Sequence, residues 1–345
     1  MRKVLLFSSV SDINDFYKQG FYIEDIAIWK SLGYDVICTN NFFDFIFKDY
    51  QVAFLYFYKW SLIPAFFSRV RQKKVYFTGG IDDLSDHMQI SFLKRVIFRL
   101  LFLINFLFAT RINIVSDSDY LNISRLLSLF TSSFKQNKIH CFPHSVNLDI
   151  VVRSNFFCKE PHTFATVCWM STKGNVIRKG LDKSLEFFYY YSLRHRESKF
   201  FIIGKIGEGT DYLKTLSFFR AIEDKVIFTD FISDERKFEL LQLSTYYMQF
   251  SKYEGFGIAA LEANLCKCYV IHSGKGGYLE SDDIWGLKFV ESSIKKREEI
   301  YAAIDFVTLL KENNNLNSKV EFLRMKYSRQ TRMINLRKLI NDGGI

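Results

Sequence analysis

Two glutamates close together in the second half of the chain are the residues best placed to do chemistry. Glu254 lies in a loop with Gly255 and Gly257, and Glu262 follows eight residues later, in a segment expected to be helical from Ile258. At ~1.5 Å per residue, the two carboxylates are at most ~12 Å apart along the helix axis. Because ionised carboxylates accept strong hydrogen bonds from hydroxyl groups, the pair could hold two ends of one elongated ligand.

The loop between the glutamates is suited to an anion. Glycines let the backbone approach a ligand closely, and the start of a helix offers unpaired N–H groups at the positive end of its dipole. Carboxylates repel phosphate but accept well from sugar hydroxyls. The ligand indicated has sugar at both ends and phosphate between them, which describes a nucleotide sugar. The spacing alone leaves a purely structural role for this loop equally open.

The elements that must position these residues alternate regularly along the chain. Short apolar segments alternate with amphipathic helical segments about six times in each half. This alternation is interrupted near residues 151–162 and then starts again. This pattern predicts an α/β protein with two Rossmann-like parallel-sheet domains, at residues 1–155 and 156–316. Ligands bind beyond the carboxyl ends of such strands, so we expect the domains to face each other across an interdomain cleft.

Composition narrows the range of partners. The 345 residues carry 47 Lys and Arg against 37 Asp and Glu, which leaves a net charge of +10 and favours anionic partners. A nucleic-acid-binding protein is a weak alternative because the charge is spread along the chain, and we expect no nucleic acid. The six cysteines are scattered and the histidines lack metal-ligand helix spacing, so we expect no metal and a reduced, cytoplasmic protein.

Two basic, aromatic segments raise the question of a membrane. The longest apolar run, Leu100–Ala109, is half the length that a transmembrane helix needs. Segments Phe54–Lys74 and Ser91–Arg111 combine aromatic residues with Lys and Arg, as helices in a membrane interface do. They could equally be helices that cover a sheet. The sequence therefore leaves open a peripheral contact with an anionic membrane, at its inner face.

Longer motifs around the glutamates carry a family resemblance. SKYEGFGIAALEA at Ser251–Ala263, GKGGYLE at Gly274–Glu280 and the preceding TDFISDERKFELLQLS are similar to motifs of the retaining GT-B glycosyltransferases of family four, the group 1 type. Gly20, followed by a helix and LGYDV at Leu32–Val36, resembles the Gly loop and first helix of that family. The resemblance covers the whole chain in outline and is most specific in the second half.

The resemblance implies an activity. It implies transfer of a hexose-type sugar from a nucleotide-diphosphate sugar to a glycan or lipid-linked glycan, with retention and without a metal. Bacterial surface polysaccharide or lipopolysaccharide synthesis is the pathway implied, and the helix in residues 317–345 would return to the first domain. A nucleotide-sugar epimerase or a phosphorylase on the same scaffold is the alternative.

The resemblance also implies residue roles. Glu254 would hold the donor hexose and Lys179 would neutralise the leaving diphosphate as the catalytic pair, while Glu262 would bind the ribose. The usual family Arg falls at Gly174 here, so Lys173 or Arg178 would replace it. The further donor-binding candidates are Gly20, Gly204, Lys205, Gly255, Phe256 and Gly257, and the acceptor-side candidates are Asp82, Asp83 and His87.

Overall fold

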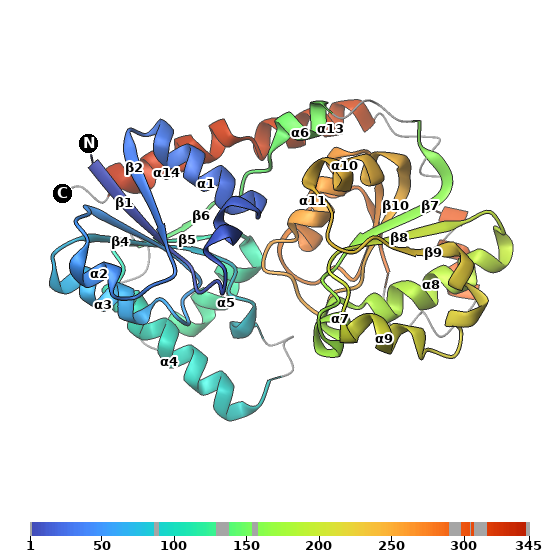
Figure 1. The fold of residues 1–345 in the computed structure, drawn as a ribbon, viewed down its shortest axis with the longest axis horizontal. Helices are drawn as coiled ribbons and strands as arrows, with labels where there is room; N and C mark the ends of the chain where they lie inside the picture. Colours follow the sequence, from blue (N-terminus) through green and yellow to red (C-terminus); the bar gives the residue numbers. More distant parts are fainter. Residues whose placement is uncertain are drawn as a thin grey trace. The chain divides into compact units, whose positions relative to one another are not determined.

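The chain folds into two compact units, each built on its own sheet. The computed structural model describes residues 2–85, 90–128, 138–153, 158–289, 298–303, 305–306 and 316–342. Unit 1 comprises Met1–Asn147 and Lys326–Ile345, and unit 2 comprises Leu148–Met325 (Figure 1). The predicted pair of six-stranded parallel sheets is confirmed.

Unit 1 contains a parallel sheet with strand order β2-β1-β3-β4-β5-β6. Its strands are β1 (Arg2–Phe7), β2 (Tyr34–Thr39), β3 (Val52–Tyr56), β4 (Lys74–Gly79), β5 (Arg111–Ile114) and β6 (Ile139–Cys141). Its helices are α1 (Gly20–Ser31), α2 (Asp44–Phe47), α3 (Leu62–Val70), α4 (Phe92–Phe108), α5 (Asp117–Ser128) and α14 (Arg329–Asp342), with short 3-10 turns η1 (Ile13–Tyr17) and η2 (Asp82–Leu84).

Alternation along the strands explains why helices cover both faces of this sheet. Leu5 and Phe7 of β1 pack into a buried cluster with residues of α2 to α5, whereas Val4 and Leu6 pack with residues of α1 and α14 (Figure 1). Successive side chains of a strand point to opposite faces, so a strand buried on both faces must be apolar throughout.

The C-terminal helix α14 is part of unit 1. Arg332 donates two hydrogen bonds to the carboxylate of Asp25 in α1, at 2.6 and 2.9 Å, and both side chains are buried. The observed division follows Asn147, eight residues before the expected boundary at 155, and the returning segment begins at Lys326 rather than at residue 317. Helix α13 (Leu316–Lys326) lies almost entirely in unit 2.

Unit 2 contains the second parallel sheet, with strand order β12-β11-β10-β7-β8-β9. Its strands are β7 (Glu160–Val167), β8 (Lys199–Ile203), β9 (Val226–Phe228), β10 (Ser244–Gln249), β11 (Tyr269–His272) and β12 (Gly286–Lys288). Its remaining named helices are α6 (Leu148–Arg153), α7 (Lys173–Lys179), α8 (Leu181–Arg194), α9 (Glu208–Lys214), α10 (Asp234–Leu243) and α11 (Ile258–Leu265), with 3-10 turns η3 (Phe219–Ala221), η4 (Glu223–Lys225) and η5 (Gly277–Glu280). Helices α10 and α11 lie on one side of the sheet, and α7, α8 and α9 lie on the other (Figure 1).

No helix among the described residues combines the length and the hydropathy that crossing a membrane requires. The longest apolar helix of unit 1, α4, spans 17 residues and carries Lys94, Arg95 and Arg99.

Candidate active site

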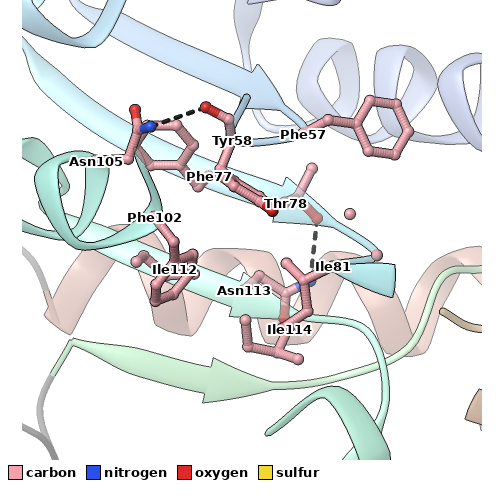
Figure 2. Close-up of a pocket in the computed structure, with 12 residues that line it drawn as sticks. Phe57, Tyr58, Phe77, Thr78, Ile81, Phe102, Asn105, Ile112, Asn113 and Ile114 are labelled. Atoms are coloured by element: carbon pink, nitrogen blue, oxygen red, sulfur yellow. Dashed lines mark hydrogen bonds between the residues drawn. The ribbon is translucent and has the colours of Figure 1, made fainter. Parts of the chain in front are cut away.

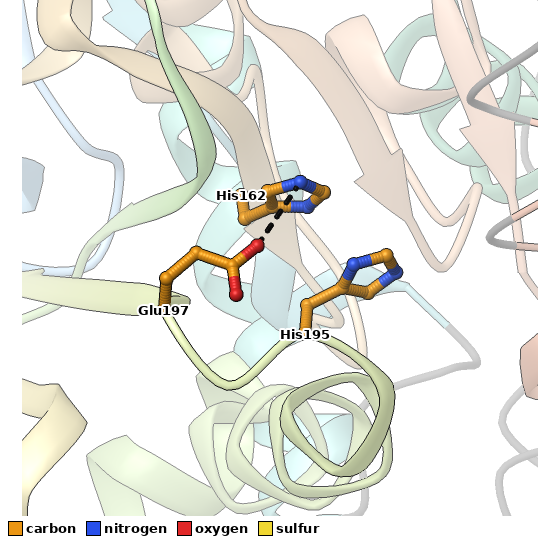
Figure 3. Close-up of side chains that lie close together, drawn as sticks. All are labelled: His162, His195 and Glu197. Atoms are coloured by element: carbon orange, nitrogen blue, oxygen red, sulfur yellow. Dashed lines mark ion pairs between the residues drawn. The ribbon is translucent and has the colours of Figure 1, made fainter.

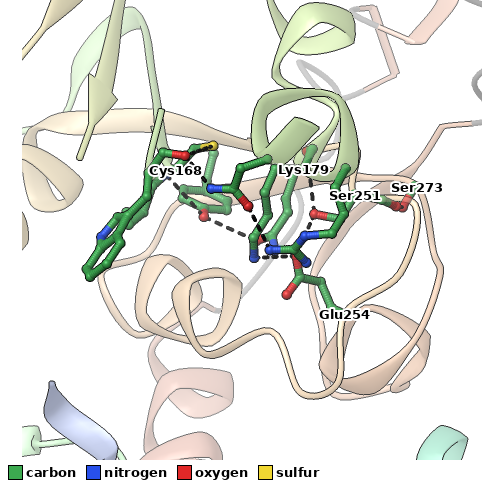
Figure 4. Close-up of polar contacts among 11 residues, drawn as sticks. Cys168, Lys179, Ser251, Glu254 and Ser273 are labelled. Atoms are coloured by element: carbon green, nitrogen blue, oxygen red, sulfur yellow. Dashed lines mark hydrogen bonds and ion pairs between the residues drawn. The ribbon is translucent and has the colours of Figure 1, made fainter. Parts of the chain in front are cut away.

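Unit 2 brings several of the predicted donor-site residues together where β10 ends. Lys179, the last residue of α7, points at Glu254, and Ser251 lies beside both (Figure 4). The Lys179 ammonium lies 2.6 Å from Glu254 Oε1, and the Ser251 hydroxyl donates to the same oxygen at 2.5 Å. The structure therefore places the predicted catalytic pair in direct contact.

The carboxylate of Glu254 is buried yet stays ionised. Only 6% of the residue is exposed. Burial alone would raise its pKa, but the Lys179 charge, the hydrogen bonds from Lys179 and Ser251 and the charge of Arg178 outweigh burial and lower the pKa below 4.5. A buried, ionised acceptor with one oxygen already bonded is suited to bind hydroxyl groups through the other.

Gly180 explains how Lys179 reaches this position. Gly180 has a φ of 64° and joins α7 to α8. A Cβ at Gly180 would lie 2.1 Å from the carbonyl oxygen of Phe250, the residue after β10. Only glycine allows this close approach in a left-handed conformation, so the Lys179–Gly180 pair fixes the end of α7 against the end of β10.

The other predicted phosphate-binding cations lie at different places. Arg178 lies close enough to Glu254 to lower its pKa, and its guanidinium donates to Asn175 Oδ1 at 3.0 Å. Lys173 is exposed at the start of α7, with its ammonium 4.4 Å from the centre of the Tyr212 ring. Of the two replacements considered for the family arginine, Arg178 is the one that lies near the predicted catalytic pair.

Gly204 and Lys205 follow β8. Gly204 has a φ of 141°, and a Cβ there would lie 2.4 Å from the carbonyl oxygen of Cys168. Lys205 is exposed, and its carbonyl accepts from the N–H of Met170 at 2.8 Å. The tight turn at Gly204 thus holds Lys205 beside the loop that follows β7.

The glycine loop between the glutamates leads directly into α11. Gly257 caps α11 with a φ of 91°, and Phe256 is buried with its carbonyl accepting from the N–H of Tyr278. Among the described residues, the N–H groups of Gly255 and Gly257 donate to no other group of the chain. These N–H groups and the first turn of α11 form a cradle for an anion.

Glu262 occupies the buried face of α11 and is paired with a lysine. Lys237 of α10 lies 3.0 Å from Glu262 Oε1 and 3.0 Å from Asp234 Oδ1. Burial raises the pKa of Glu262 above 4.5 although Lys237 opposes it, whereas the two carboxylates outweigh burial and raise the pKa of Lys237. The ion pair with Lys237 therefore favours the ionised form of Glu262, whereas burial favours the protonated form.

Sequence reasoning missed two residues of this site, Ser251 and Lys237. Both lie inside the motifs that carried the resemblance, Ser251 three residues before Glu254 and Lys237 in the segment before β10. The spacing of these residues in the sequence does not predict their contacts with the glutamates. Lys237, for example, reaches Glu262 only because α10 packs beside α11.

Three of the predicted residues of unit 1, Gly20, Asp82 and Asp83, lie in segments that follow the carboxyl ends of β1 and β4. Gly20 begins α1, and a Cβ there would meet open space. Asp82 and Asp83 lie in η2, and Asp83 is paired with Lys59. His87 lies outside the described residues.

A small pocket adjoins η2 at the ends of β3, β4 and β5 (Figure 2). Tyr58 and Asn105 line the pocket and are buried, and the Tyr58 hydroxyl and Asn105 Oδ1 lack a hydrogen-bond partner among the described residues. Burial, together with Asp83, Asp82 and Asp119, raises the pKa of the Tyr58 phenol, which stays protonated. The pocket therefore offers one donor and one acceptor to a small polar group or a water molecule.

Comparison with known structures identifies the fold. HepE of Anabaena, crystallised with UDP and glucose, matches with a TM-score of 0.71 and 14% identity over 99% of this chain and 100% of its own. Sucrose-phosphate synthase of Thermosynechococcus elongatus matches with a TM-score of 0.72 and 13% identity over 99% and 98%. TarM of S. aureus matches with a TM-score of 0.59 and 14% identity over 85% of this chain and 55% of its own. The protein has the GT-B fold.

Sequence comparison finds a family match in the second half of the chain. Residues 173–318 match the family described as glycosyl transferases group 1, and they include Lys179, Glu254 and Glu262. No curated protein matches the chain. This matched segment, which makes up most of unit 2, is similar to the group 1 glycosyltransferases, as the motifs in the sequence predicted.

Proposed function

We propose that this enzyme transfers a hexose-type sugar from a nucleoside diphosphate to a hydroxyl of a glycan or lipid-linked glycan, with retention of anomeric configuration. The observation that carries this proposal is the buried, ionised Glu254, held by Lys179 and Ser251 beside the start of α11. Bacterial surface polysaccharide or lipopolysaccharide synthesis is the proposed setting, in the cytoplasm at the inner face of the membrane.

Each part of the site has a role in this proposal. The second oxygen of Glu254 accepts hydrogen bonds from hexose hydroxyls, and Glu262 accepts from the ribose diol. Lys179 and Arg178 neutralise the charge that develops on the diphosphate as the glycosidic bond breaks, with the N–H groups of Gly255 and Gly257 as further donors. The acceptor hydroxyl attacks the face that the nucleotide leaves and gives its proton to the departing diphosphate oxygen, so the new glycosidic bond keeps the anomeric configuration and free nucleoside diphosphate is released.

The test compares Glu254→Gln with Glu239→Gln, a matched change at an exposed, paired glutamate of α10. Each protein is incubated with UDP- and GDP-hexoses and a lipid-linked glycan acceptor, and the rate of sugar transfer is measured. We expect Glu254→Gln to lower kcat by about 10²–10³-fold in a protein that is still folded at the assay temperature, and Glu239→Gln to retain activity. Equal activity in the two variants would remove Glu254 from the mechanism.

We also propose that transfer needs no metal ion, because Lys179, Arg178 and the α11 N-terminus supply positive charge where the diphosphate would bind. Activity is then expected to persist in EDTA. Complete loss of turnover that Mg²⁺ or Mn²⁺ restores would contradict this part of the proposal.

A second activity on the same scaffold is tested by the products. A nucleotide-sugar epimerase returns a nucleotide sugar, and a phosphorylase consumes inorganic phosphate. The transferase releases free nucleoside diphosphate in equal amount to the glycan formed. Product analysis by mass spectrometry therefore distinguishes the three.

An apolar, basic face of unit 1 supports a membrane-borne acceptor. Helices α3 and α4 pack together through Phe66 and Phe108, and exposed apolar side chains extend along both helices. They include Ile63, Phe66, Val70, Phe92, Leu93, Leu100 and Leu107, with Phe92 83% exposed. Lys94 and Arg69 lie on the same two helices, as expected for a surface that meets anionic lipid.

Cosedimentation with liposomes tests this contact. We expect the full chain to bind vesicles that contain anionic phosphatidylglycerol and to bind neutral vesicles weakly. The double change Phe92→Ser and Leu93→Ser is expected to reduce binding without changing donor hydrolysis. If the chain binds neither kind of vesicle, the membrane contact is excluded.

No nucleic-acid partner is proposed. A gel shift with nucleic acid that survives physiological salt would contradict this.

A further inference from the structure

Among the described residues, one group of His and Glu side chains is arranged to hold an ion: His162, His195 and Glu197 (Figure 3). His162 is the third residue of β7, His195 caps the C-terminus of α8, and Glu197 lies two residues further on. One ligand atom from each residue lies within 4.8 Å of the other two.

His162 is fixed in place by its surroundings. Its Nδ1 is hydrogen-bonded at 2.6 Å to the hydroxyl of the buried Tyr191. Its ring stacks on the His195 ring, with centroids 4.2 Å apart and planes 19° apart. The backbone of His162 has a φ of 60°, a conformation that is costly for a residue other than glycine.

The arrangement leaves an electron-rich gap between two of the groups. Nε2 of His162 lies 3.3 Å from Glu197 Oε1. In the tautomer that carries its proton on Nδ1, this nitrogen donates to the Tyr191 oxygen and Nε2 presents a lone pair to a carboxylate oxygen. Two such atoms repel each other unless a proton or a metal ion lies between them, and an outer hydrogen bond at Nδ1 is the arrangement that metal-bound histidines commonly show. In the other tautomer, Nε2–H donates to Glu197, and a bound metal ion would displace that proton.

We propose that His162, His195 and Glu197 form a binding site for Zn²⁺, with water as the fourth ligand. Two imidazoles and one carboxylate are ligands that Zn²⁺ favours, and bonds of ~2.0–2.1 Å in a tetrahedron place ligand atoms ~3.3 Å apart. The His162–Glu197 separation already matches this spacing. His195, on the exposed turn after α8, brings in the third ligand by rotation of its side chain.

The ion would be structural rather than catalytic. His162 lies near the amino end of β7, whereas Glu254, Lys205 and the glycine loop follow the carboxyl ends of their strands. A bound ion would join the start of β7 to the end of α8. The inference is therefore independent of the proposed transferase activity and of its expected independence from metal.

The test is a metal titration of the full chain. The exposed Cys141 and Cys158 are first changed to Ser, so that thiolates do not compete for the ion. Metal-free protein is titrated with Co²⁺, followed by its visible spectrum, and then with competing Zn²⁺. We expect one ion per chain with a tetrahedral Co²⁺ spectrum that lacks thiolate bands, and a higher melting temperature with Zn²⁺ bound.

Variants then identify the ligands. Glu197→Gln and His195→Ala change partly or largely exposed side chains, and we expect each to weaken Zn²⁺ binding at least 100-fold. Tyr191→Phe removes the bond to Nδ1, together with the interaction of the Tyr191 hydroxyl with Tyr246, and is expected to weaken binding about 10–100-fold. Arg196→Ala, an exposed residue between His195 and Glu197, is the matched control and should bind as the parent does. Absence of stoichiometric binding, or binding that Glu197→Gln and His195→Ala leave unchanged, would overturn the proposal.

Discussion

Burial acts on both glutamates of the site, but their lysine partners compensate to different extents. Lys179, with help from Ser251, lowers the pKa of Glu254 below 4.5, whereas the pKa of Glu262 stays above 4.5 despite Lys237. Glu262 therefore takes up its proton first as the pH falls, and Glu254 is still ionised at that point. Because the folded-state pKa of Glu254 is lowered, its charge stabilises unit 2 above pH 4.5, and this contribution is lost as the pH falls below that value.

Replacement of Lys237 by Met tests whether this lysine keeps Glu262 ionised. In the variant, the Lys237 charge no longer counteracts the effect of burial on Glu262. The pKa of Glu262 therefore rises further. As the pH is lowered, we expect the affinity for the nucleoside diphosphate to begin falling at a higher pH in the variant than in the parent. Near neutral pH, the variant should bind about 10-fold or more weakly than the parent. Calorimetric titration with UDP and GDP between about pH 5 and pH 8 measures this.

Arg236→Met is the matched control for Lys237→Met. Arg236 is the preceding residue of α10, and its pair with Glu239 is exposed. The control should follow the parent at every pH, since an exposed pair contributes little. An affinity profile of Lys237→Met that overlays the control would show that Lys237 has only a structural role.

At the residue scale, the sequence predicted the acids better than their partners. Glu254 and Glu262 are recognisable because they flank a glycine loop, and Lys179 because it precedes a glycine. Ser251 and Lys237 carry no such signal: their contacts depend on how a loop and a neighbouring helix pack. The glycine loop also has a structural contact, because the Tyr278 N–H donates to the Phe256 carbonyl and joins this loop to η5.

At the element scale, the junction between α7 and α8 determines the position of Lys179, the lysine proposed to be catalytic. Gly180→Ala would place a methyl group 2.1 Å from the Phe250 carbonyl oxygen in a left-handed conformation. We expect a loss of about 2–4 kcal/mol of stability and a large fall in kcat, because α7 must move away from β10 and carry Lys179 with it. Denaturant unfolding and transfer assays measure the two effects.

A second glycine of α7 provides the control for Gly180→Ala. A Cβ at Gly174 would meet no atom closer than Thr172 Oγ1 at 4.0 Å. Gly174→Ala should therefore retain activity and gain about 0.5–1 kcal/mol of stability from the higher helix propensity of alanine. If both variants retain activity, the close approach at Gly180 does not position Lys179.

The turn after α11 shows what sequence patterns leave undetermined at this scale. The turn runs from Cys266 to Tyr269 and contains neither Gly nor Pro, so the sequence offers no recognisable turn signal there. Lys267 adopts the left-handed conformation with a φ of 62°. The Asn264 amide donates to the Cys268 carbonyl at 2.9 Å and to the Trp285 carbonyl at 3.0 Å. Side-chain bonds of this kind depend on tertiary neighbours and are not predictable from turn chemistry.

At the scale of the whole molecule, the two parallel sheets followed from alternation of apolar and amphipathic segments, which local sequence records directly. The closure of unit 1 by its C-terminal helix was implied only by the resemblance. The contacts that secure α14 join residues about 300 positions apart, Glu24 with Arg329 and Asp25 with Arg332. Each pair is bidentate, but no local pattern connects an acidic pair in α1 with arginines in α14.

The buried pair of Asp25 and Arg332 predicts how strongly α14 holds unit 1 together. Arg332 also donates to the Pro143 carbonyl at 2.6 Å, and Tyr56 donates to Asp25 at 3.0 Å. Arg332→Met leaves the Asp25 charge buried without its cation, so we expect a cost of about 3–5 kcal/mol and a melting temperature lower by roughly 10 °C. Arg337→Met, on the exposed face of α14, should melt as the parent does.

A compensating change separates the lost ion pair from lost packing. Asp25→Asn removes the uncompensated charge, and the amide still accepts from Tyr56. We therefore expect the double variant Asp25→Asn with Arg332→Met to be more stable than Arg332→Met alone, because replacing a buried pair costs less than breaking it. If the double variant is no more stable, the arginine acts through its packing against Phe142, whose ring centre lies 5.9 Å from the guanidinium carbon. The attachment of α14 would then depend on apolar contact rather than on charge.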